Sequence, residues 1–428
     1  MNRGRHLTIN KSSVFVLLCF VVLFEGNYWA LLSIFVGPAS YRYIFWVIVL
    51  LICCVFLGGK FKKNMIMAPW LAYFILVIFR NQEIASGGYI NTYRIVLCML
   101  TLLIMAQNDR WIITFPTILI TVSFPNVLAT LLFYINNNYY EKFVSATYRS
   151  YQSGTANGLY GYRAGIADHY SQNGTYITMV LLVLASLLLI NSMAKKGKKY
   201  YLLAFALTAI ALIMTEKRAH LLFSIATLLV VYLIGNSKRM SRKVFKLATA
   251  AVAILVFGGL FIDQLPMIQS VLGRFESVGT DSNITKRFFM WTLAINQFWK
   301  NPLFGSGFLG FMFNKENISL IIDASAGCHN IYIQLLSECG LIGLMVLIAG
   351  IISALYISIK NLRSTMNDLN LREYRGAIIS SLAIQIFSLL YGFTGNMIYD
   401  RTFNFYILAV AASMAFYITH GSHSENRC

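Results

Sequence analysis

Charged side chains are scarce in this sequence of 428 residues. Asp, Glu, Lys and Arg make up 12% of it, whereas hydrophobic residues make up 58%. A soluble domain carries roughly twice that charged fraction. The scarcity of charge therefore excludes an ordinary soluble protein and favours one that is surrounded by lipid. The apolar residues form continuous runs without alternation, so a transmembrane β-barrel is not expected either.

Cysteine and acidic residues are also few. The seven cysteines form no C-x-x-C pair and their number is odd, so neither a disulfide framework nor a metal site is expected. Only 16 Asp and Glu residues stand against 35 Lys and Arg, which gives a net charge of +19. In so apolar a chain the positive-inside rule accounts for this excess, and no nucleic-acid partner is expected.

Apolar segments long enough to cross a hydrocarbon core of about 30 Å recur along the chain. We predict an all-α, polytopic protein in which residues 1–428 form a single integral membrane domain with about 12 transmembrane helices. The N-terminus resembles a secretory signal, but no A-x-A-like site follows, so it is interpreted as a retained first helix. The predicted spans are 13–35, 40–58, 65–80, 90–106, 111–134, 169–191, 200–214, 219–235, 244–263, 329–359, 376–393 and 405–419.

The connections between these spans alternate in their density of Lys and Arg. Short basic connections such as GKFKKN, AKKGKK and NSKRMSRK are assigned to the cytoplasm, which predicts that both termini are cytoplasmic. Two long loops, at about 135–168 and 264–328, are then extracytoplasmic. They are rich in Tyr, Phe, Trp and Gly, which argues against disorder. Long ordered loops commonly carry function, so we expect the functional site on this side.

Three arginines, Arg163, Arg218 and Arg287, lie near outer helix ends, where the positive-inside rule does not favour them. An arginine within hydrocarbon costs roughly 2.5–3.5 kcal/mol, so its charge needs a partner. The guanidinium fork binds phosphate oxygens in pairs, and three converging arginines predict a diphosphate site at the outer leaflet. The alternative is contact with lipid headgroups, or pairing with Glu216 and Asp168. The headgroup alternative is favoured for the other outer arginines, Arg42, Arg80 and Arg94.

Residues 286–298 show the spacing of an amphipathic helix. Phe288, Trp291, Ile295 and Phe298 recur at intervals of three and four and form one stripe. Asn283 or Thr285 could cap this helix, and Pro302 would end it. The stripe could lie in the membrane interface or pack on the transmembrane bundle. Either placement puts the neighbouring Arg287 at headgroup depth.

The run Gly305-Ser306-Gly307-Phe308-Leu309-Gly310 matches the G-x-G-x-x-G pattern. No strand or βαβ unit surrounds it, so a dinucleotide site is not expected. We interpret the glycines as a tight turn that returns the chain to the bundle.

His329 opens a predicted transmembrane span on the outer side. It could be an interfacial residue, a metal ligand or a general base. The adjacent Cys328 offers poor spacing for a metal. As a base, His329 would remove a proton from a sugar hydroxyl. Glu338 lies in the apolar run that follows, where it could orient the helix or pair with an arginine.

The combination R-x3-W, N-P-L-F-G-S-G-F and H-N-x-Y-x-Q-x-L-x-E-x-G-L-I-G resembles the C-terminal region shared by O-antigen ligases and Wzy-type polysaccharide polymerases. The pattern is carried by Arg287, Trp291, Asn301–Phe308, His329, Asn330, Tyr332, Gln334, Leu336, Glu338 and Gly340–Gly343. It covers about 60 residues closely, and extends loosely to the Arg163 and Arg218 segments.

The resemblance implies a metal-independent, GT-C-like glycosyltransferase that needs no cofactor. Its substrates would be undecaprenyl-diphosphate-linked oligosaccharides at the outer face of the bacterial inner (plasma) membrane. By position, His329 would be the catalytic base, with Asn330, Tyr332 and Glu338 supporting it. Arg218 and Arg287 would hold the donor diphosphate, and Arg163 would assist at the acceptor or the diphosphate. Membrane lipids, a chain-length regulator and a flippase are candidate partners in lipopolysaccharide or capsule biosynthesis.

The sequence departs from the commoner serine-arginine form at its second arginine site, where it has Glu216-Lys217-Arg218. We expect a polymerase, because the outer loops are rich in aromatic residues. The first alternative is a ligase that transfers finished glycan to lipid A-core or another acceptor. The second is a transporter or flippase for the same lipid-linked sugars, which should place functional charge near mid-membrane instead of at the helix ends.

Overall fold

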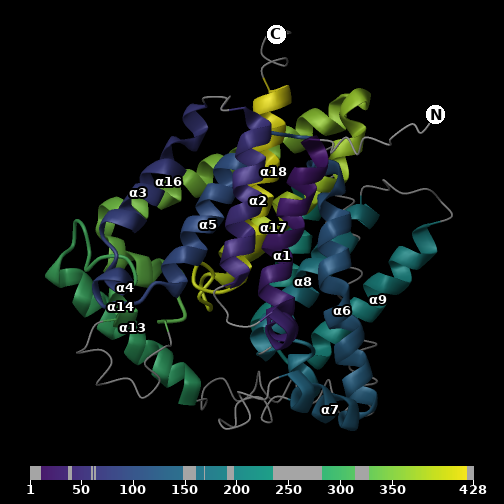
Figure 1. Ribbon diagram of the computed structural model, residues 1–428, viewed down its shortest axis with the longest axis horizontal. Helices are drawn as coiled ribbons and strands as arrows, with labels where there is room; N and C mark the ends of the chain where they lie inside the picture. Colours follow the sequence, from purple (N-terminus) through teal and green to yellow (C-terminus); the bar gives the residue numbers. More distant parts are fainter. Residues whose placement is uncertain are drawn as a thin grey trace, which may run out of the picture.

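The computed structural model of the protein is built of helices (Figure 1). It describes residues 11–36, 41–58, 61, 64–147, 161–167, 169–189, 197–234, 282–313 and 327–421. Across these ranges the backbone forms no β-strand, and a single isolated bridge pairs Asn81 with Phe308. The all-α class predicted from the sequence is therefore confirmed.

The helices follow the predicted spans. Each predicted span coincides with a helix except 244–263, which lies outside the described residues. The helices are α1 (Lys11–Val36), α2 (Tyr41–Leu57), α3 (Ala68–Phe79), α4 (Gln82–Ala85), α5 (Ile90–Met105), α6 (Phe115–Ile135), α7 (Asn137–Thr147), α8 (Tyr170–Leu189), α9 (Lys198–Met214), α10 (Arg218–Ile234), α13 (Ser282–Lys300), α14 (Gly310–Phe313), α16 (Ile331–Asn367), α17 (Arg375–Tyr391) and α18 (Thr402–His420). Short 3₁₀ turns lie at Met65–Met67, Ile112–Thr114, Gly161–Ala164 and Leu369–Tyr374.

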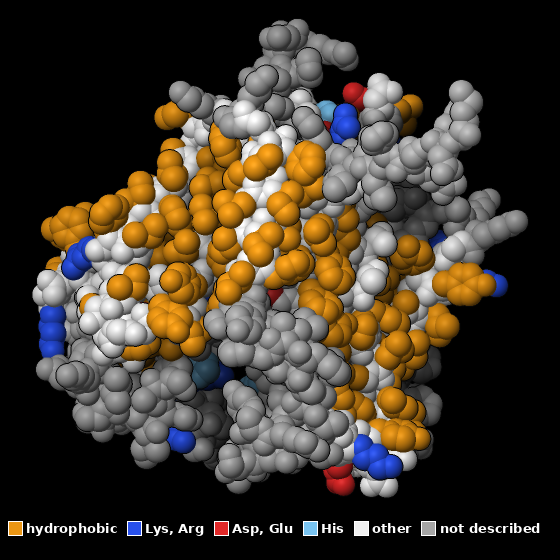
Figure 2. All heavy atoms as spheres, in the orientation of Figure 1, with side chains coloured by type: hydrophobic (Ala, Val, Ile, Leu, Met, Phe, Trp, Pro, Cys, Tyr) orange, Lys and Arg blue, Asp and Glu red, His pale blue; other side chains and the backbone are white. Residues whose placement is uncertain are grey.

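Several helices have the length and composition of membrane spans. Among the described residues, five helical segments are long and apolar enough to cross a membrane, and shorter apolar helices accompany them. Figure 2 shows apolar side chains over the middle of the molecule, while most Lys and Arg side chains in view lie at its margins. This distribution is typical of a protein surrounded by lipid. The chain is a polytopic membrane protein; the twelve-span topology and the cytoplasmic termini remain predictions.

The two C-terminal helices lie at the centre of the bundle (Figure 1). α18 is buried along Thr402–Phe416, and it packs on α17, α5 and α16. The alanine-rich stretch Ala409–Ala415 lets neighbouring helices approach closely, which is the main source of packing energy in lipid. The hydroxyl of Ser358 on α16 donates to that of Ser413 at 2.8 Å, and the amide of Gln385 on α17 donates to Ser358 at 2.8 Å. These polar contacts fix the register of the central helices.

α16 is interrupted near its N-terminal end, where the sequence predicted one continuous span at 329–359. Gly340 has φ 65° and ψ −169°, which breaks the helix. The amides freed by the break, on Leu341 and Ile342, donate to the carbonyls of Pro302 and Leu303 at 2.9 and 3.2 Å. An interrupted helix is tolerated in a membrane only where its backbone groups find such partners.

The segment that fills the break is the glycine-rich turn at 302–307. The amides of Ser306 and Gly307 donate to the carbonyls of Ser337 and Glu338 at 3.0 and 2.8 Å, so the turn binds both sides of the interruption. Gly305 and Gly307 have φ of 66° and 99°, a region that favours glycine. The tight turn that the sequence predicted is confirmed, and its glycines also allow two backbones to touch.

Replacing Gly305 by alanine should destabilise this junction strongly. A Cβ atom at Gly305 would lie 2.4 Å from the carbonyl of Glu338, which cannot move without breaking α16 further. Gly87 is the matched control, because its φ of 84° carries the same backbone strain but nothing lies within 4 Å of its added Cβ. We expect Gly305→Ala to lower the apparent melting temperature of detergent-purified protein well below that of Gly87→Ala. Equal melting temperatures would show that the close approach contributes nothing.

α13 is the amphipathic helix predicted at 286–298. Its buried face consists of Met290, Ala294 and Gln297, whereas Phe288 and Ile295 of the predicted stripe are 58% and 41% exposed. Trp291 of the same stripe instead packs against Cys328 and Phe311, so the stripe is divided between the two predicted placements. The exposed apolar residues beside polar ones favour the membrane interface.

The predicted C-terminal end of α13 is confirmed, whereas the predicted N-terminal caps are not. The helix stops at Lys300, two residues before Pro302, as predicted. It already includes Ser282, so the predicted caps at Asn283 and Thr285 are wrong: both residues lie inside the first turn.

Candidate active site

His329 lies in a short connection immediately before α16 and has an unusual backbone. Its φ is 53°, one of three positive values at non-glycine residues in the described ranges, the others being at Glu216 and Leu309. Such a conformation costs roughly 1–3 kcal/mol and persists where surrounding contacts impose it. Strain of this kind concentrates at functional sites. All three residues lie in segments that the sequence singled out.

Neighbouring elements hold the His329 connection from several sides. The His329 amide donates to the side-chain oxygen of Asn396 at 3.1 Å, and the indole of Trp291 on α13 donates to the Cys328 carbonyl at 2.8 Å. The Cys328 amide donates to the side chain of Gln334 at 3.0 Å. The backbone that carries the imidazole is therefore fixed before any ligand binds.

Asn330 and Tyr332, which the sequence predicted to support His329, both make hydrogen bonds to backbone groups. Asn330 caps α16, since its side-chain oxygen accepts from the amides of Tyr332 and Ile333 at 3.1 and 3.2 Å. The hydroxyl of Tyr332 donates to the carbonyl of Leu389 on α17 at 2.8 Å. Both contacts anchor the start of α16 and thereby the residue before it.

Glu338 has the orienting role that the sequence left open. Its fully buried carboxylate accepts from the amides of Leu309 and Phe311 at 3.1 and 3.3 Å, and from the side chain of Gln334 at 3.0 Å. The hydroxyl of Tyr399 donates to the same carboxylate. The Glu338 side chain therefore fastens the start of α14, just after the glycine-rich turn, to α16.

Arg287 lies on α13, one turn before Trp291. Its charge acts on His329 and also on Tyr391 at the end of α17. The fold thus brings Arg287 and His329, which are 42 positions apart in the sequence, into one cluster. Figure 2 shows histidine and Lys or Arg side chains together at a hollow near the lower end of the molecule.

The second predicted arginine segment is the turn from α9 to α10. Arg218 is the first residue of α10, and Glu216 in the turn has φ 54°. A guanidinium nitrogen of Arg163 lies 2.8 Å from the Glu216 carboxylate. Arg163 therefore makes the ion pair that was the alternative to diphosphate binding, and it braces the turn that carries Arg218. Asp168, the other acidic partner considered, lies outside the described residues.

Sequence reasoning assigned no role to Lys217, although it stands beside Arg218. Its ammonium nitrogen lies 3.9 Å from the centre of the Tyr170 ring, and its charge acts on both His169 and His329. The sequence did contain a clue: Lys217 precedes Arg218 at the position where the commoner form of this site has a serine.

His169 is a second imidazole of the cluster. Its Nδ1 accepts a hydrogen bond from the Ser171 amide at 3.0 Å, which leaves the proton of the neutral ring on Nε2. Burial first, and then the charges of Lys217 and His329, lower the pKa of His169 to about 4. At neutral pH the ring is uncharged and offers an N–H donor.

The connection between α17 and α18 completes the cluster with Tyr391 and Asp400. The hydroxyl of Tyr391 donates to Asp400 and accepts from Ser171. The Asp400 carboxylate also accepts from the Thr402 amide at 2.8 Å. Burial raises the pKa of Asp400 to about 6. Neither residue lies in a motif, and only the folded chain places them beside α8.

The charge state of His329 decides what it can do. Burial, followed by the positive charges of Arg287 and Lys217, lowers the pKa of His329 to about 4. At neutral pH, well above that value, the imidazole is neutral and can accept a proton. An anion that neutralised the two cations would raise this pKa and make the imidazole a stronger base.

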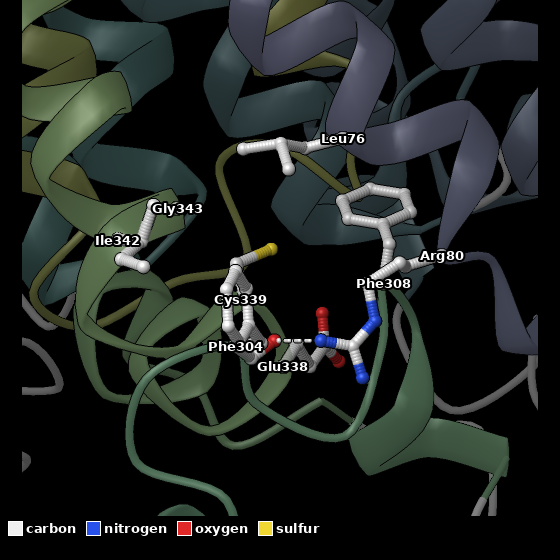
Figure 3. Close-up of a pocket in the computed structure, with 8 residues that line it drawn as sticks. All are labelled: Leu76, Arg80, Phe304, Phe308, Glu338, Cys339, Ile342 and Gly343. Atoms are coloured by element: carbon white, nitrogen blue, oxygen red, sulfur yellow. Dashed lines mark hydrogen bonds between the residues drawn. The ribbon is translucent and has the colours of Figure 1, made fainter.

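A pocket of the described residues lies apart from this cluster, between α3 and α16 (Figure 3). The Arg80 guanidinium donates to the carbonyls of Phe304 and Gly305 at 3.0 and 3.2 Å, and so fixes the glycine-rich turn. The pocket is lined by Leu76, Arg80, Phe304, Phe308, Glu338, Cys339, Ile342 and Gly343.

Arg94, another of the predicted outer arginines, lies outside this pocket. It is buried and donates to the Ile398 carbonyl at 3.3 Å, so the prediction that it contacts lipid headgroups is wrong.

The described residues offer no group of three or more His, Cys, Asp or Glu side chains that could hold a metal ion. The chemistry available at His329 is a neutral imidazole beside fixed cations. Such a set can remove a proton and stabilise an anionic leaving group.

Comparison with known families finds a match for one part of the chain. Residues 203–348 match the model of a family described as O-Antigen ligase (Wzy_C). The matched residues include Lys217, Arg218, Arg287 and His329. No curated protein matches the chain. The match points to a glycosyltransferase-like membrane enzyme and does not distinguish a polymerase from a ligase. The chain thus carries an O-antigen ligase-type domain at residues 203–348, which confirms the resemblance to the superfamily of O-antigen ligases and Wzy-type polymerases.

Proposed function

We propose that this protein is a polysaccharide polymerase. It joins undecaprenyl-diphosphate-linked oligosaccharide repeat units into O-antigen or capsular polysaccharide at the outer face of the bacterial inner membrane. The observation that supports this proposal best is the strained, neutral imidazole of His329 under the charges of Arg287 and Lys217. Lys217, Arg287 and His329 lie within the region that matches the O-antigen ligase family.

The proposed reaction is a displacement at the anomeric carbon of the donor saccharide. A hydroxyl oxygen of the acceptor attacks that carbon, the bond from carbon to phosphate oxygen breaks, and the electron pair leaves with the lipid diphosphate. His329 takes the hydroxyl proton. Arg287 and Arg218 stabilise the charge that develops on the diphosphate, because fixed cations need no rearrangement during the reaction. Arg163 contributes by bracing Glu216 in the turn before Arg218.

A ligase that transfers finished glycan to lipid A-core or another acceptor would use the same chemistry, and the description of the matched family favours it as the second candidate. A flippase for the same lipid-linked sugars is a weaker candidate. A transporter is expected to carry functional charge near the middle of the membrane. Here the candidate charges lie at the starts of α8, α10, α13 and α16.

Deletion of the gene, followed by gel analysis of the glycan, tests the three candidates together. Loss of a polymerase should leave glycan that is a single repeat unit long. Long glycan that is not attached to its acceptor would favour the ligase. Loss of precursor from the outer leaflet would favour the flippase, and either of these two results would contradict the polymerase proposal.

Chelators should leave the activity of the purified enzyme unchanged. The leaving diphosphate is stabilised in this scheme by guanidinium and ammonium groups, so removal of divalent ions costs no catalytic contact. The measurement is glycan extension with and without EDTA, with an excess of Mg²⁺ or Mn²⁺ added back in parallel. Inhibition that one metal reverses would contradict the proposed mechanism.

A further inference from the structure

The imidazole of His329 lacks the orienting partner that a general base usually has. Such a base is commonly held by a third group, which forms a hydrogen bond with the ring nitrogen that does not react. Within the described ranges the His329 ring makes no hydrogen bond, whereas its backbone amide donates to the side-chain oxygen of Asn396 at 3.1 Å. The direction of the ring therefore depends on the backbone that carries it.

Two side-chain oxygens from different elements receive this stretch of backbone. The consecutive amides of Cys328 and His329 donate to the carboxamide oxygens of Gln334 and Asn396, at 3.0 and 3.1 Å. A Cβ atom at the preceding residue, Gly327, would lie 2.5 Å from the Gln334 oxygen and 2.9 Å from the Asn396 oxygen. The glycine thus leaves the space in which both carboxamides meet the chain.

The contact with Asn396 bears directly on the unusual backbone of His329. It holds the peptide plane between Cys328 and His329, and the φ of 53° is the rotation of His329 relative to that plane. A residue other than glycine keeps such a conformation only where its surroundings impose it. If the plane turned, φ could relax to an ordinary negative value, and the imidazole would swing with it.

Asn396 is itself fastened to α16 through the connection between α17 and α18. Its carbonyl accepts from the Tyr399 amide at 2.7 Å, and the Tyr399 hydroxyl donates to the buried carboxylate of Glu338. In the same connection, the Gly392 carbonyl accepts from the Ile331 amide at 2.9 Å. An amide N–H can only donate, so the Asn396 carboxamide has to present its oxygen to His329.

We propose that Asn396 is a positioning residue, which orients the His329 imidazole through its backbone amide. The inference rests on the proposed function, because it needs His329 to be the base of that reaction. Asn396 lies after the matched residues 203–348, so the functional site extends into the connection between α17 and α18. Its oxygen takes the place of a partner on the ring and leaves both ring nitrogens accessible.

Steady-state kinetics of glycan extension by the full-length protein in nanodiscs test this role. Asn396→Leu keeps the size of the side chain and removes the oxygen. We expect kcat to fall about ten- to hundredfold, since a small misplacement of a catalytic group costs rate. KM for the undecaprenyl-diphosphate-linked oligosaccharide donor should stay near that of wild type, because Asn396 orients the base and not the diphosphate. Asn396→Asp keeps an oxygen at the same place and should restore most of kcat.

Asn108→Leu is the matched control. The Asn108 side chain accepts from the Arg110 amide at 2.9 Å in the connection between α5 and α6, which is the same kind of contact. The adjacent Asp109 pairs at 2.8 Å with His420, at the opposite end of α18 from Asn396. We expect wild-type kinetics for this variant. Asn396→Ala, which removes the oxygen without adding apolar surface, tests the same contact if Asn396→Leu does not fold.

The outcomes separate orientation of the base from a general structural role. A wild-type kcat in Asn396→Leu, a loss that Asn396→Asp does not restore, or a rise in KM in place of the fall in kcat would each overturn the inference. The proposed function would stand in these cases, provided that His329→Asn remains strongly impaired. If wild type itself extends no glycan, or if His329→Asn extends it at the wild-type rate, both fail.

Discussion

Replacing His329 by asparagine should reduce glycan extension by about 10²- to 10⁴-fold, the contribution expected of a general base. Asparagine is the sharper substitution, since it tolerates the left-handed backbone that His329 adopts at φ 53°. An alanine at this position would add backbone strain to the loss of the imidazole. The measurement is extension of a lipid-linked oligosaccharide by purified protein at equal enzyme concentration.

The abundance and melting temperature of the His329→Asn protein are the necessary controls. The connection that carries His329 is held by backbone contacts to Asn396, Trp291 and Gln334, none of which uses the imidazole. We therefore expect the variant to insert and fold like wild type. Extension at the wild-type rate would remove His329 from the mechanism.

Replacing Arg287 by lysine should lower turnover severely although the charge is kept. A guanidinium donates two parallel hydrogen bonds to a phosphate, and an ammonium cannot reproduce that geometry. The loss of a charge-assisted hydrogen bond of about 1.5–3 kcal/mol corresponds to roughly ten- to hundredfold in kcat/KM. Steady-state kinetics with the lipid-diphosphate donor measure the effect.

Lys286→Gln is the control for Arg287→Lys. Lys286 is exposed on the same turn of α13, so its replacement removes a neighbouring charge without touching the cluster. We expect it to behave like wild type. Near-normal kinetics of Arg287→Lys would instead indicate that Arg287 faces lipid headgroups, the alternative that the sequence left open.

The positions of the helices could be predicted from the sequence because a membrane imposes a simple length rule on apolar runs. The interruption of α16 could not. Gly340 stands in an apolar run that is typical of a continuous helix, and the break depends on the turn at 302–307, which supplies partners for the exposed backbone. For the same reason the spacing around Gly305 predicted a turn but not the helix against which the turn packs.

The sequence could predict those residues of the candidate site that are of a type unusual at a membrane boundary. Arg287 and His329 are predicted to stand at an outer membrane boundary, and in the fold the charge of Arg287 acts on His329. Arg163 has the same predicted placement but forms an ion pair with Glu216. The position of an arginine in the sequence therefore does not tell whether it binds substrate or stabilises a neighbouring turn. Tyr391 and Asp400 are ordinary residues at the end of an apolar run. Only the packing of α17 against α8 makes them part of the cluster.

The most direct measurement is a cryo-EM structure of the protein with undecaprenyl diphosphate bound. We expect density for the diphosphate within hydrogen-bond distance, about 3 Å, of the Arg287 guanidinium and next to the imidazole of His329. A diphosphate bound elsewhere on the outer side, with Arg287 directed to lipid and His329 remote from it, would contradict the proposed site.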